Sequence, residues 1–163
     1  MLKDKSSKIE KVVVNIGVGR MSQTPNFDDK VLPEVIREAS MILGQRPQTR
    51  GAKKSIAGFK TRTGQLIGLR ATLRGVRARD FLTRVVNVVL PRVKDFRGID
   101  LHSVDKEGHL NFGMREHVVF PEINPEQSKV NFGLGISVVL KDIKDRDDAI
   151  AFLRSFGIPL KAK

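Results

Sequence analysis

The sequence predicts an α+β fold of two layers, in which a mostly antiparallel sheet has helices packed on one face and an open second face. Several segments alternate apolar and polar residues, which is the pattern of strands with one buried face. Three further segments repeat apolar residues at helical spacing and are able to cover that face. Their order along the chain is strand, helix, two strands, helix, two strands, helix, with no internal repeat.

Two long strands are predicted in the first half of the chain. In the first, the even-numbered residues from Val12 to Val18 are apolar, and the odd-numbered residues form a mixed face that includes Asn15. In the second, the odd-numbered residues from Ile67 to Leu73 are apolar and alternate with Arg70, Thr72 and Arg74. Weaker strand character begins at Arg46. Two later strands are expected, Leu110–Met114 and Val130–Leu140.

Three helices are predicted between these strands and after them. The first has an apolar stripe from Val31 to Leu43, and Pro33 fits only if the helix begins near Asp29 or Lys30. The second opens at Asp80 and stops at Pro91. The third opens at Asp145 and is closed by Gly157. All three have a wide apolar face, so each is expected to pack on the sheet.

Length and composition indicate one folded domain over residues 1–163. Hydrophobic residues make up 40% of the chain, which excludes a wholly disordered basic tail. The absence of cysteine removes disulfides, thiolate catalysis and the common zinc sites, and fits a reducing compartment. No apolar run approaches membrane-spanning length, and Met1 to Glu10 does not resemble a signal peptide. We therefore expect a soluble, cytoplasmic protein.

The net charge of +12 is concentrated in one segment. Between Arg46 and Arg97 the chain has 14 Lys and Arg residues but only two acids, Asp80 and Asp95, so this segment alone has a charge of +12. The rest of the chain balances 16 bases with 16 acids. Such a concentration favours a surface that binds a polyanion, and a merely well-solvated basic face is the alternative.

The open face of the sheet is the first candidate for that surface. Successive side chains of a strand point to opposite faces, so the odd or even position of a residue, its parity, decides which face it lies on. By parity, the open face has Asn15, Arg70, Thr72 and Arg74. Two arginines on one strand face repel each other, and a bound anion is the simplest reason to tolerate them. Two solvated arginines are the alternative.

A loop at residues 53–64 is the second candidate. It combines cations with an aromatic side chain, in Lys53, Lys54, Phe59, Lys60 and Arg62. A loop with this many cations is expected to contact phosphates, and a phenylalanine is able to stack on a base. The alternative for Phe59 is that its ring packs on the domain.

Catalytic and metal-binding patterns are missing from the sequence. The Gly17-Val18-Gly19 segment lacks the third glycine of a dinucleotide-binding loop, and no phosphate-binding loop precedes a Lys-Ser or Lys-Thr pair. The three histidines, His102, His109 and His117, have no zinc spacing and are expected on the surface or facing RNA. We therefore predict no catalytic residue, no metal and no cofactor.

Six blocks of sequence follow one another along most of the chain. They are Val14–Gly19, Gly44–Pro47, Ala52–Lys60, Thr72–Gly75, Pro91–Gly98 and Arg115–Ile123. In this order they closely resemble the family of bacterial-type large-subunit ribosomal protein five. The resemblance implies a structural constituent of the central protuberance that binds 5S ribosomal RNA.

The resemblance also implies further partners and particular residues. The implied partners are 23S ribosomal RNA, transfer RNA in the peptidyl site, other proteins of the central protuberance and small-subunit protein thirteen, reached through an inter-subunit bridge. By the same resemblance the 5S contacts fall on Asn15, Gln45, Thr72 and Arg74, to which parity adds Arg70. The loop with Lys53, Lys54, Phe59, Lys60 and Arg62 is implied to reach toward the transfer RNA.

Three features depart from the family pattern. The resemblance implies an N-terminal helix that we expect this sequence to lack, Gln65-Leu66 replaces an aromatic-proline pair, and His117 replaces a glutamine. Two other function classes stay open: an enzyme that acts on RNA, which needs a cofactor loop or a carboxylate cluster, and a nonspecific RNA chaperone. An organellar ribosome is an alternative to the cytoplasmic one.

Overall fold

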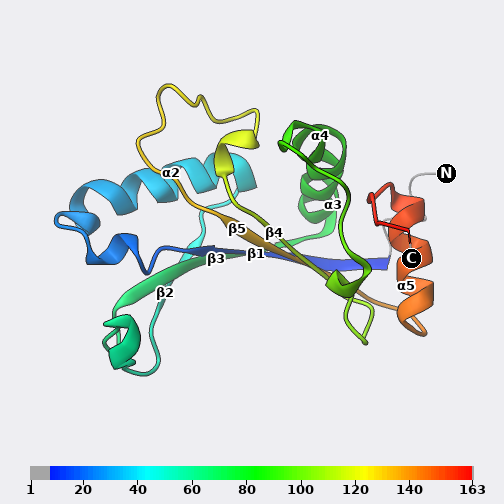
Figure 1. Cartoon of the computed structure of the whole chain (residues 1–163), viewed down its shortest axis with the longest axis horizontal. Coiled ribbons are helices and arrows are strands. Elements are labelled where there is room, and N and C mark those ends of the chain that lie inside the picture. Colours follow the sequence, from blue (N-terminus) through cyan, green and yellow to red (C-terminus); the bar gives the residue numbers. More distant parts are fainter. Residues whose placement is uncertain (1–7, 163) are drawn as a thin grey trace. The chain divides into compact units, whose positions relative to one another are not determined.

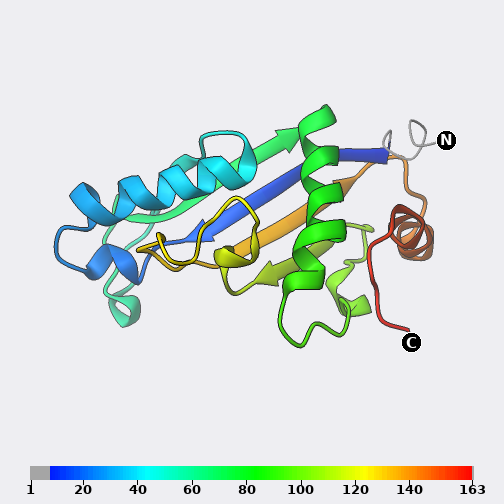
Figure 2. The ribbon, with the colours of Figure 1, turned by 90° about the horizontal axis from the view of Figure 1, so that it is seen from above.

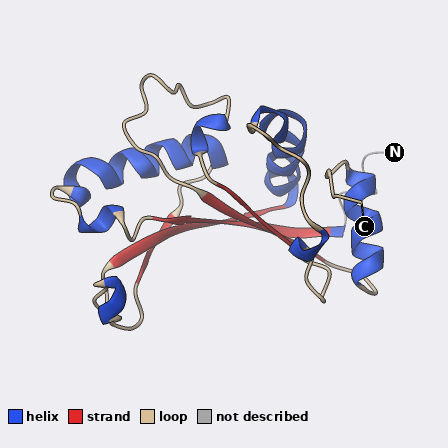
Figure 3. Ribbon diagram, viewed as in Figure 1, coloured by secondary structure: helices blue, strands red, loops and turns tan. Residues whose placement is uncertain are grey.

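The protein is described by a computed structural model over residues 8–162. Residues 1–7, which contain most of the segment considered as a signal peptide, lie outside the described range. Five strands form one antiparallel sheet of order β2-β3-β1-β5-β4. Figure 3 shows the strands in red and the helices in blue. The strands are β1 (Ile9–Gly17), β2 (Gln48–Gly51), β3 (Leu66–Arg74), β4 (Leu110–Met114) and β5 (Leu134–Leu140). The main helices are α2 (Leu32–Leu43), α3 (Gly75–Arg84) and α5 (Arg146–Phe156).

The predicted fold class and order of elements are confirmed. The structure divides into two compact units, and the strands β1, β3, β4 and β5 contribute to both. Unit 1 contains the chain up to Val13, Thr72–Gly113 and the chain from Gly135 onward, whereas unit 2 contains Val14–Ala71 and Met114–Leu134. The single domain over residues 1–163 stays a prediction.

In unit 2 the helix α2 lies over one face of the strands (Figure 1). The apolar side of β1 is buried beneath it, with Val14 and Ile16 at most 2% exposed, and Val18 directly after the strand has no exposed surface. From the helix, Val35, Ala39 and Ile42 have no exposed surface. The helix ends where predicted, because Gly44 adopts a left-handed backbone with φ of 63° that is easy only for glycine.

In unit 1 the helical segment that starts with α3 crosses the strands (Figure 2). It buries Ala78, Phe81 and Leu82 against them. The helix α5 lies beyond the strand ends (Figure 2), and Asp145 caps its first turn by accepting a hydrogen bond from the Asp148 N–H at 2.8 Å. Gly157, with φ of 104°, closes α5 as predicted.

The second helix differs from the prediction at both ends. It begins at Gly75 and not at Asp80, because Gly75 has a φ of 58° and lets the chain turn directly out of β3. The helical backbone also continues past Val89, through a π-helical turn (Val85–Val89) into the short helix α4 (Leu90–Arg92). Pro91 lies in the first turn of α4, where its missing N–H is tolerated.

Two strands also differ from the predicted pattern. The strand expected from Val130 begins only at Leu134, at the start of β5. In β1 the alternation fails in the middle of the strand, since Val13 has the parity of the mixed face but is only 5% exposed. The backbone before α2 is helical earlier than predicted, in a π-helical turn at Phe27–Val31.

Within residues 8–162, no helix is both long and apolar enough to span a membrane.

Candidate nucleic-acid interface

From Leu69 onward the side chains of β3 alternate between the core and solvent as predicted, whereas Ile67, which was predicted in the core, is 37% exposed. Leu69, Ala71 and Leu73 are at most 2% exposed. On the other parity Arg70 and Arg74 are exposed and Thr72 is half-buried. In unit 2 the strand therefore presents the Arg70 guanidinium, and in unit 1 the Thr72 hydroxyl and the Arg74 guanidinium, each on the side opposite its buried neighbours. Such groups suit phosphate and sugar oxygens.

The neighbouring strand β2 adds two polar residues to this face in unit 2. Gln48 lies directly opposite Arg70 in the antiparallel register, and Arg50 lies opposite Gly68. Directly opposed residues of an antiparallel pair share a face, so Gln48 and Arg50 belong with Arg70. The Arg50 Nη2 group donates to Gln48 Oε1 at 3.1 Å, which fits that placement. The sequence analysis did not predict either residue for this face. Gln48 and Arg50 are two positions apart, which is the spacing of residues on one face of a strand.

Asn15 belongs to the same face of unit 2. It is exposed on β1 between Val14 and Ile16, which are buried on the opposite side. Gly68 keeps the surface flat here, since a Cβ atom at that position would lie 3.1 Å from the Ile16 carbonyl oxygen. The open face of unit 2 thus brings together Asn15 with three residues of the adjoining strands: Gln48, Arg50 and Arg70.

Arg70 and Arg74 differ in their electrostatic surroundings. In unit 1, Arg74 Nη1 lies 3.7 Å from Glu10 Oε1, and Lys11 Nζ lies 3.2 Å from the same oxygen. Arg70 has no ion pair with an acid in the described part of the chain. The charge of Arg70 is therefore the less neutralised of the two.

Gln45 takes its position from the end of α2. It follows Gly44 directly and is half-buried in the short connection to β2. Parity does not place this residue on the open face, so its role rests on the family resemblance alone.

The basic loop is a small hairpin in unit 2. Ile56 and Thr61 exchange two backbone hydrogen bonds of 2.9 and 3.1 Å, and a 3₁₀ turn (Ala57–Phe59) forms the tip. Lys60 ends that turn with a left-handed backbone, at a φ of 51°. All four cations of the loop and Phe59 are exposed, the side chain of Phe59 to 72%.

Side chains tie this hairpin to the segment after β1. Gln23 Nε2 donates to the Phe59 carbonyl oxygen at 3.1 Å, and Gln65 Nε2 donates to Ser22 Oγ at the same distance. Gln65 Oε1 also accepts from the Arg62 N–H at 2.9 Å. The residue that departs from the family pattern at position 65 therefore fixes the base of the loop.

His117 contradicts the prediction that the histidines lie on the surface. Its side chain has no exposed surface, and its Nε2 atom lies 2.6 Å from Oε2 of the buried Glu38. Sequence reasoning missed Glu38, although it lies at helical spacing from Val35 and Ile42 within the apolar stripe. His102 is exposed, as predicted, and His109 is half-buried.

The described residues hold no cluster of three or more His, Cys, Asp or Glu side chains placed to bind a metal ion. His109 Nδ1 accepts instead from the Leu140 N–H at 3.3 Å, which is a structural role.

The arrangement of unit 2 offers cations, amides and an exposed aromatic ring. Such groups bind a folded polyanion and position it.

Comparison with known families covers nearly the whole chain. A family model described as "Ribosomal protein L5" matches residues 5–62, and a second model, which describes the C-terminus of the same ribosomal protein family, matches residues 66–160. Large ribosomal subunit protein uL5 of Fusobacterium nucleatum is 43% identical over 154 residues, which are 94% of this chain and 81% of the relative.

Two further relatives give the same picture. Large ribosomal subunit protein uL5 of Syntrophomonas wolfei is 44% identical over 94% of this chain and 84% of its own length. The protein of the same name from Thermotoga maritima is 42% identical over 94% of this chain and 81% of its own length.

Proposed function

The chain belongs to the family of large ribosomal subunit protein uL5, and on this basis we propose that its open sheet face binds 5S ribosomal RNA. It is a protein of the large ribosomal subunit. Members of this family are structural ribosomal proteins and not enzymes, so the alternative of an RNA-modifying enzyme is set aside.

One observation carries the proposal. Arg70 is exposed in the middle of β3, lacks an acidic partner among the described residues, and is flanked on β2 by Gln48 and Arg50. A guanidinium group without a partner is costly to place beside another cation unless an anion lies between them. An RNA backbone crossing the face supplies phosphates at this point.

The neutral residues complete the proposed contact. Asn15, Gln45 and Thr72 offer donors and acceptors for ribose hydroxyls and base edges, and Arg74 offers a second guanidinium. The flat backbone at Gly68 allows close approach of the RNA.

The basic loop has a separate place in the proposal. Lys53, Lys54, Lys60 and Arg62 are all exposed and lie outside the sheet, where they are available to a second RNA. By family resemblance this second RNA is transfer RNA in the peptidyl site. Contacts with 23S ribosomal RNA, other central-protuberance proteins and small-subunit protein thirteen, and a place on the cytoplasmic ribosome, rest on the same resemblance.

Competition binding tests the proposed function. The full chain is titrated with labelled 5S ribosomal RNA against an unlabelled RNA of equal length and unrelated sequence, over a series of salt concentrations. We expect the unrelated RNA to compete poorly and the affinity to fall by roughly 0.7 to 0.9 log units per log unit of salt for each neutralised phosphate. Equal displacement by both RNAs would instead identify a nonspecific RNA chaperone.

A further inference from the structure

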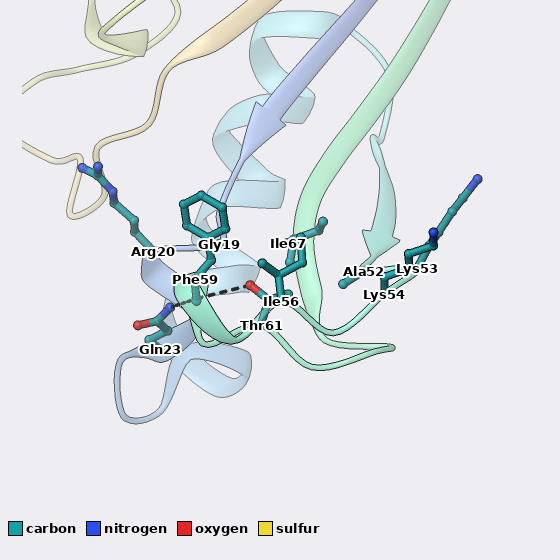
Figure 4. Close-up of a pocket in the computed structure, with 10 residues that line it drawn as sticks. All are labelled: Gly19, Arg20, Gln23, Ala52, Lys53, Lys54, Ile56, Phe59, Thr61 and Ile67. Atoms are coloured by element: carbon teal, nitrogen blue, oxygen red, sulfur yellow. Dashed lines mark hydrogen bonds between the residues drawn. The ribbon is translucent and has the colours of Figure 1, made fainter.

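A pocket of about 590 Å³ opens between the segment after β1 and the loop hairpin of unit 2 (Figure 4). Gly19 and Gln23 line it from the first of these segments, and Ile56 and Phe59 line it from the hairpin. The start of β3 contributes Ile67. A volume of roughly 300 to 1,000 Å³ is typical of sites that bind small molecules. The pocket is therefore large enough for a small organic ligand.

Three large apolar side chains form what we call the apolar wall of this pocket. They are Phe59, Ile56 and Ile67, which are 72%, 50% and 37% exposed. Ile67 is the most informative, because it has the parity of the buried residues of β3 and yet remains open to solvent. Exposed apolar side chains gathered in one hollow mark a place where another molecule binds.

The two neutral polar side chains of the pocket are already engaged by one carbonyl group. Gln23 Nε2 donates to the Phe59 carbonyl oxygen at 3.1 Å (Figure 4), and Thr61 Oγ1 donates to the same oxygen at 3.3 Å. A hydroxyl has a single proton to donate, so Thr61 offers no further donor. A polar ligand would leave most of its hydrogen-bonding groups unpaired against the apolar wall, which is costly. The occupant therefore needs an apolar body.

The charged side chains of the pocket are all of one sign. Arg20, Lys53 and Lys54 are cations, and no lining residue is an acid. Figure 4 shows the side chains of Arg20 and Lys53 extending from opposite sides of the pocket, away from its apolar centre. Cations in this position attract a negative group at the end of the occupant and not in its middle.

We propose that this pocket binds a small amphipathic anion, with an aromatic body against the apolar wall and a carboxylate or sulfonate at the rim, toward Arg20 or Lys53. The ligand is a small molecule, so this site goes beyond the proposed RNA-binding function and does not depend on it. A nucleotide fits the pocket less well, because the edge of its base has several donors and acceptors that the apolar wall leaves unpaired.

A matched pair of fluorescent dyes tests the pocket in the full chain. Anilinonaphthalene sulfonate is the anionic probe, and phenylnaphthylamine, which has the same rings without the sulfonate, is the neutral probe. The wild type should bind the anionic dye more tightly than the neutral one. Phe59→Ala should weaken binding of both dyes by roughly 2- to 12-fold, which is the range for the loss of one aromatic contact.

Two further variants separate the shape of the pocket from its charge. A Cβ atom at Gly19 would lie 3.9 Å from Ile67 Cβ, so Gly19→Leu should fill the pocket and weaken both dyes without removing a lining side chain. The double variant Arg20→Gln/Lys53→Gln should weaken binding of the anionic dye by up to about fivefold for each exposed cation that it contacts. The same double variant should leave the neutral dye unchanged.

The control is an apolar residue of the same unit that does not line the pocket. Met41 is 48% exposed on α2, and Met41→Ala should bind both dyes like the wild type. Uridine monophosphate, added as a competitor, should displace the anionic dye poorly.

Three results would overturn the pocket assignment. They are wild-type dye affinity in both Phe59→Ala and Gly19→Leu, equal affinity of the wild type for the two dyes, and tighter binding of uridine monophosphate than of the anionic dye. The last result would identify a nucleotide site instead. None of them touches the preference for 5S ribosomal RNA over unrelated RNA, which tests the proposed function separately.

Discussion

His117 and Glu38 form a buried hydrogen bond of 2.6 Å between the imidazole Nε2 and the carboxyl Oε2. They are 79 positions apart in the sequence and join the segment after β4 to α2 within unit 2. The Phe132 N–H points to Nδ1 at 3.4 Å, so Nδ1 acts as an acceptor and we assign Nε2 as the donor to Glu38. The ring also stacks on Phe132, with centroids 3.9 Å apart.

Removing either partner of this pair should destabilise the fold, by unequal amounts. His117→Leu leaves the buried Glu38 carboxyl with the Ser128 hydroxyl at 3.0 Å and with Arg37 Nη2 at 3.9 Å from its other oxygen, so about 3–5 kcal/mol should be lost. Glu38→Ala leaves a buried ring N–H, and the expected loss is about 1–3 kcal/mol. Urea unfolding measures both, and a larger loss in Glu38→Ala would contradict the assignment.

The family glutamine gives a matched control at this position. His117→Gln retains an N–H donor of similar reach and should be more stable than His117→Leu in the same unfolding experiment. Equal stability of these two variants would show that packing, and not the hydrogen bond, holds the pair.

This pair also marks the limit of what the sequence predicted. Alternation and capping residues predicted the order of elements, because strand parity and the ends at Gly44 and Gly157 depend on local backbone preferences. Burial of His117 depends on a partner far away in the chain, which no local pattern reveals. The start of α3 at Gly75 was missed because Asp80 resembled a cap, while the turn at Gly75 needs a positive φ.

Gly133 should not tolerate a side chain. A Cβ atom there would lie 2.9 Å from the Met114 carbonyl oxygen and 3.3 Å from that of Arg115. Both neighbours are backbone, so Gly133→Ala should force the strands apart and cost about 1–3 kcal/mol by thermal or urea unfolding. Gly58→Ala is the control, because no atom lies within 4 Å of its Cβ position. If both variants are equally stable, the close approach at Gly133 is wrong.

The cap of α5 should contribute measurably to the stability of unit 1. Asp145 Oδ1 accepts from the Asp148 N–H at 2.8 Å, and Asp145→Ala should cost about 0.5–2 kcal/mol. Asp147 is an acid of the same turn without that hydrogen bond, so Asp147→Ala should cost less. Circular dichroism during urea unfolding compares the two, and an equal effect would count against the cap.

Glu10 should weaken RNA binding because its carboxylate forms an ion pair with Arg74. Its carboxylate lies 3.7 Å from Arg74 Nη1, and both side chains are partly exposed, so the ion pair itself contributes at most about 1 kcal/mol. Glu10→Gln frees Arg74 and removes a charge that repels phosphate, and affinity for 5S ribosomal RNA should rise by up to about fivefold. Filter binding at low salt measures this, and a weaker complex would exclude Arg74 from the contact.

The candidate site was predicted only in part. Parity placed Asn15, Arg70 and Arg74 at positions that are exposed and Thr72 at one that is half-buried, since alternation is a property of each strand alone. Gln48 and Arg50 join them only through the register of β2 with β3, which depends on pairing between strands. The pocket beside Phe59 depends on contacts between the loop and the segment at Arg20, and such contacts leave no periodic signal.

The dissociation constant of Arg70→Ala for 5S ribosomal RNA tests the central claim most directly. Arg154→Ala, which removes an exposed arginine from α5, is the matched control. We predict that Arg70→Ala weakens binding by about 1–3 kcal/mol, or roughly 5- to 150-fold, and that Arg154→Ala binds like the wild type. Wild-type affinity in Arg70→Ala would contradict the assignment of the open sheet face as the 5S contact.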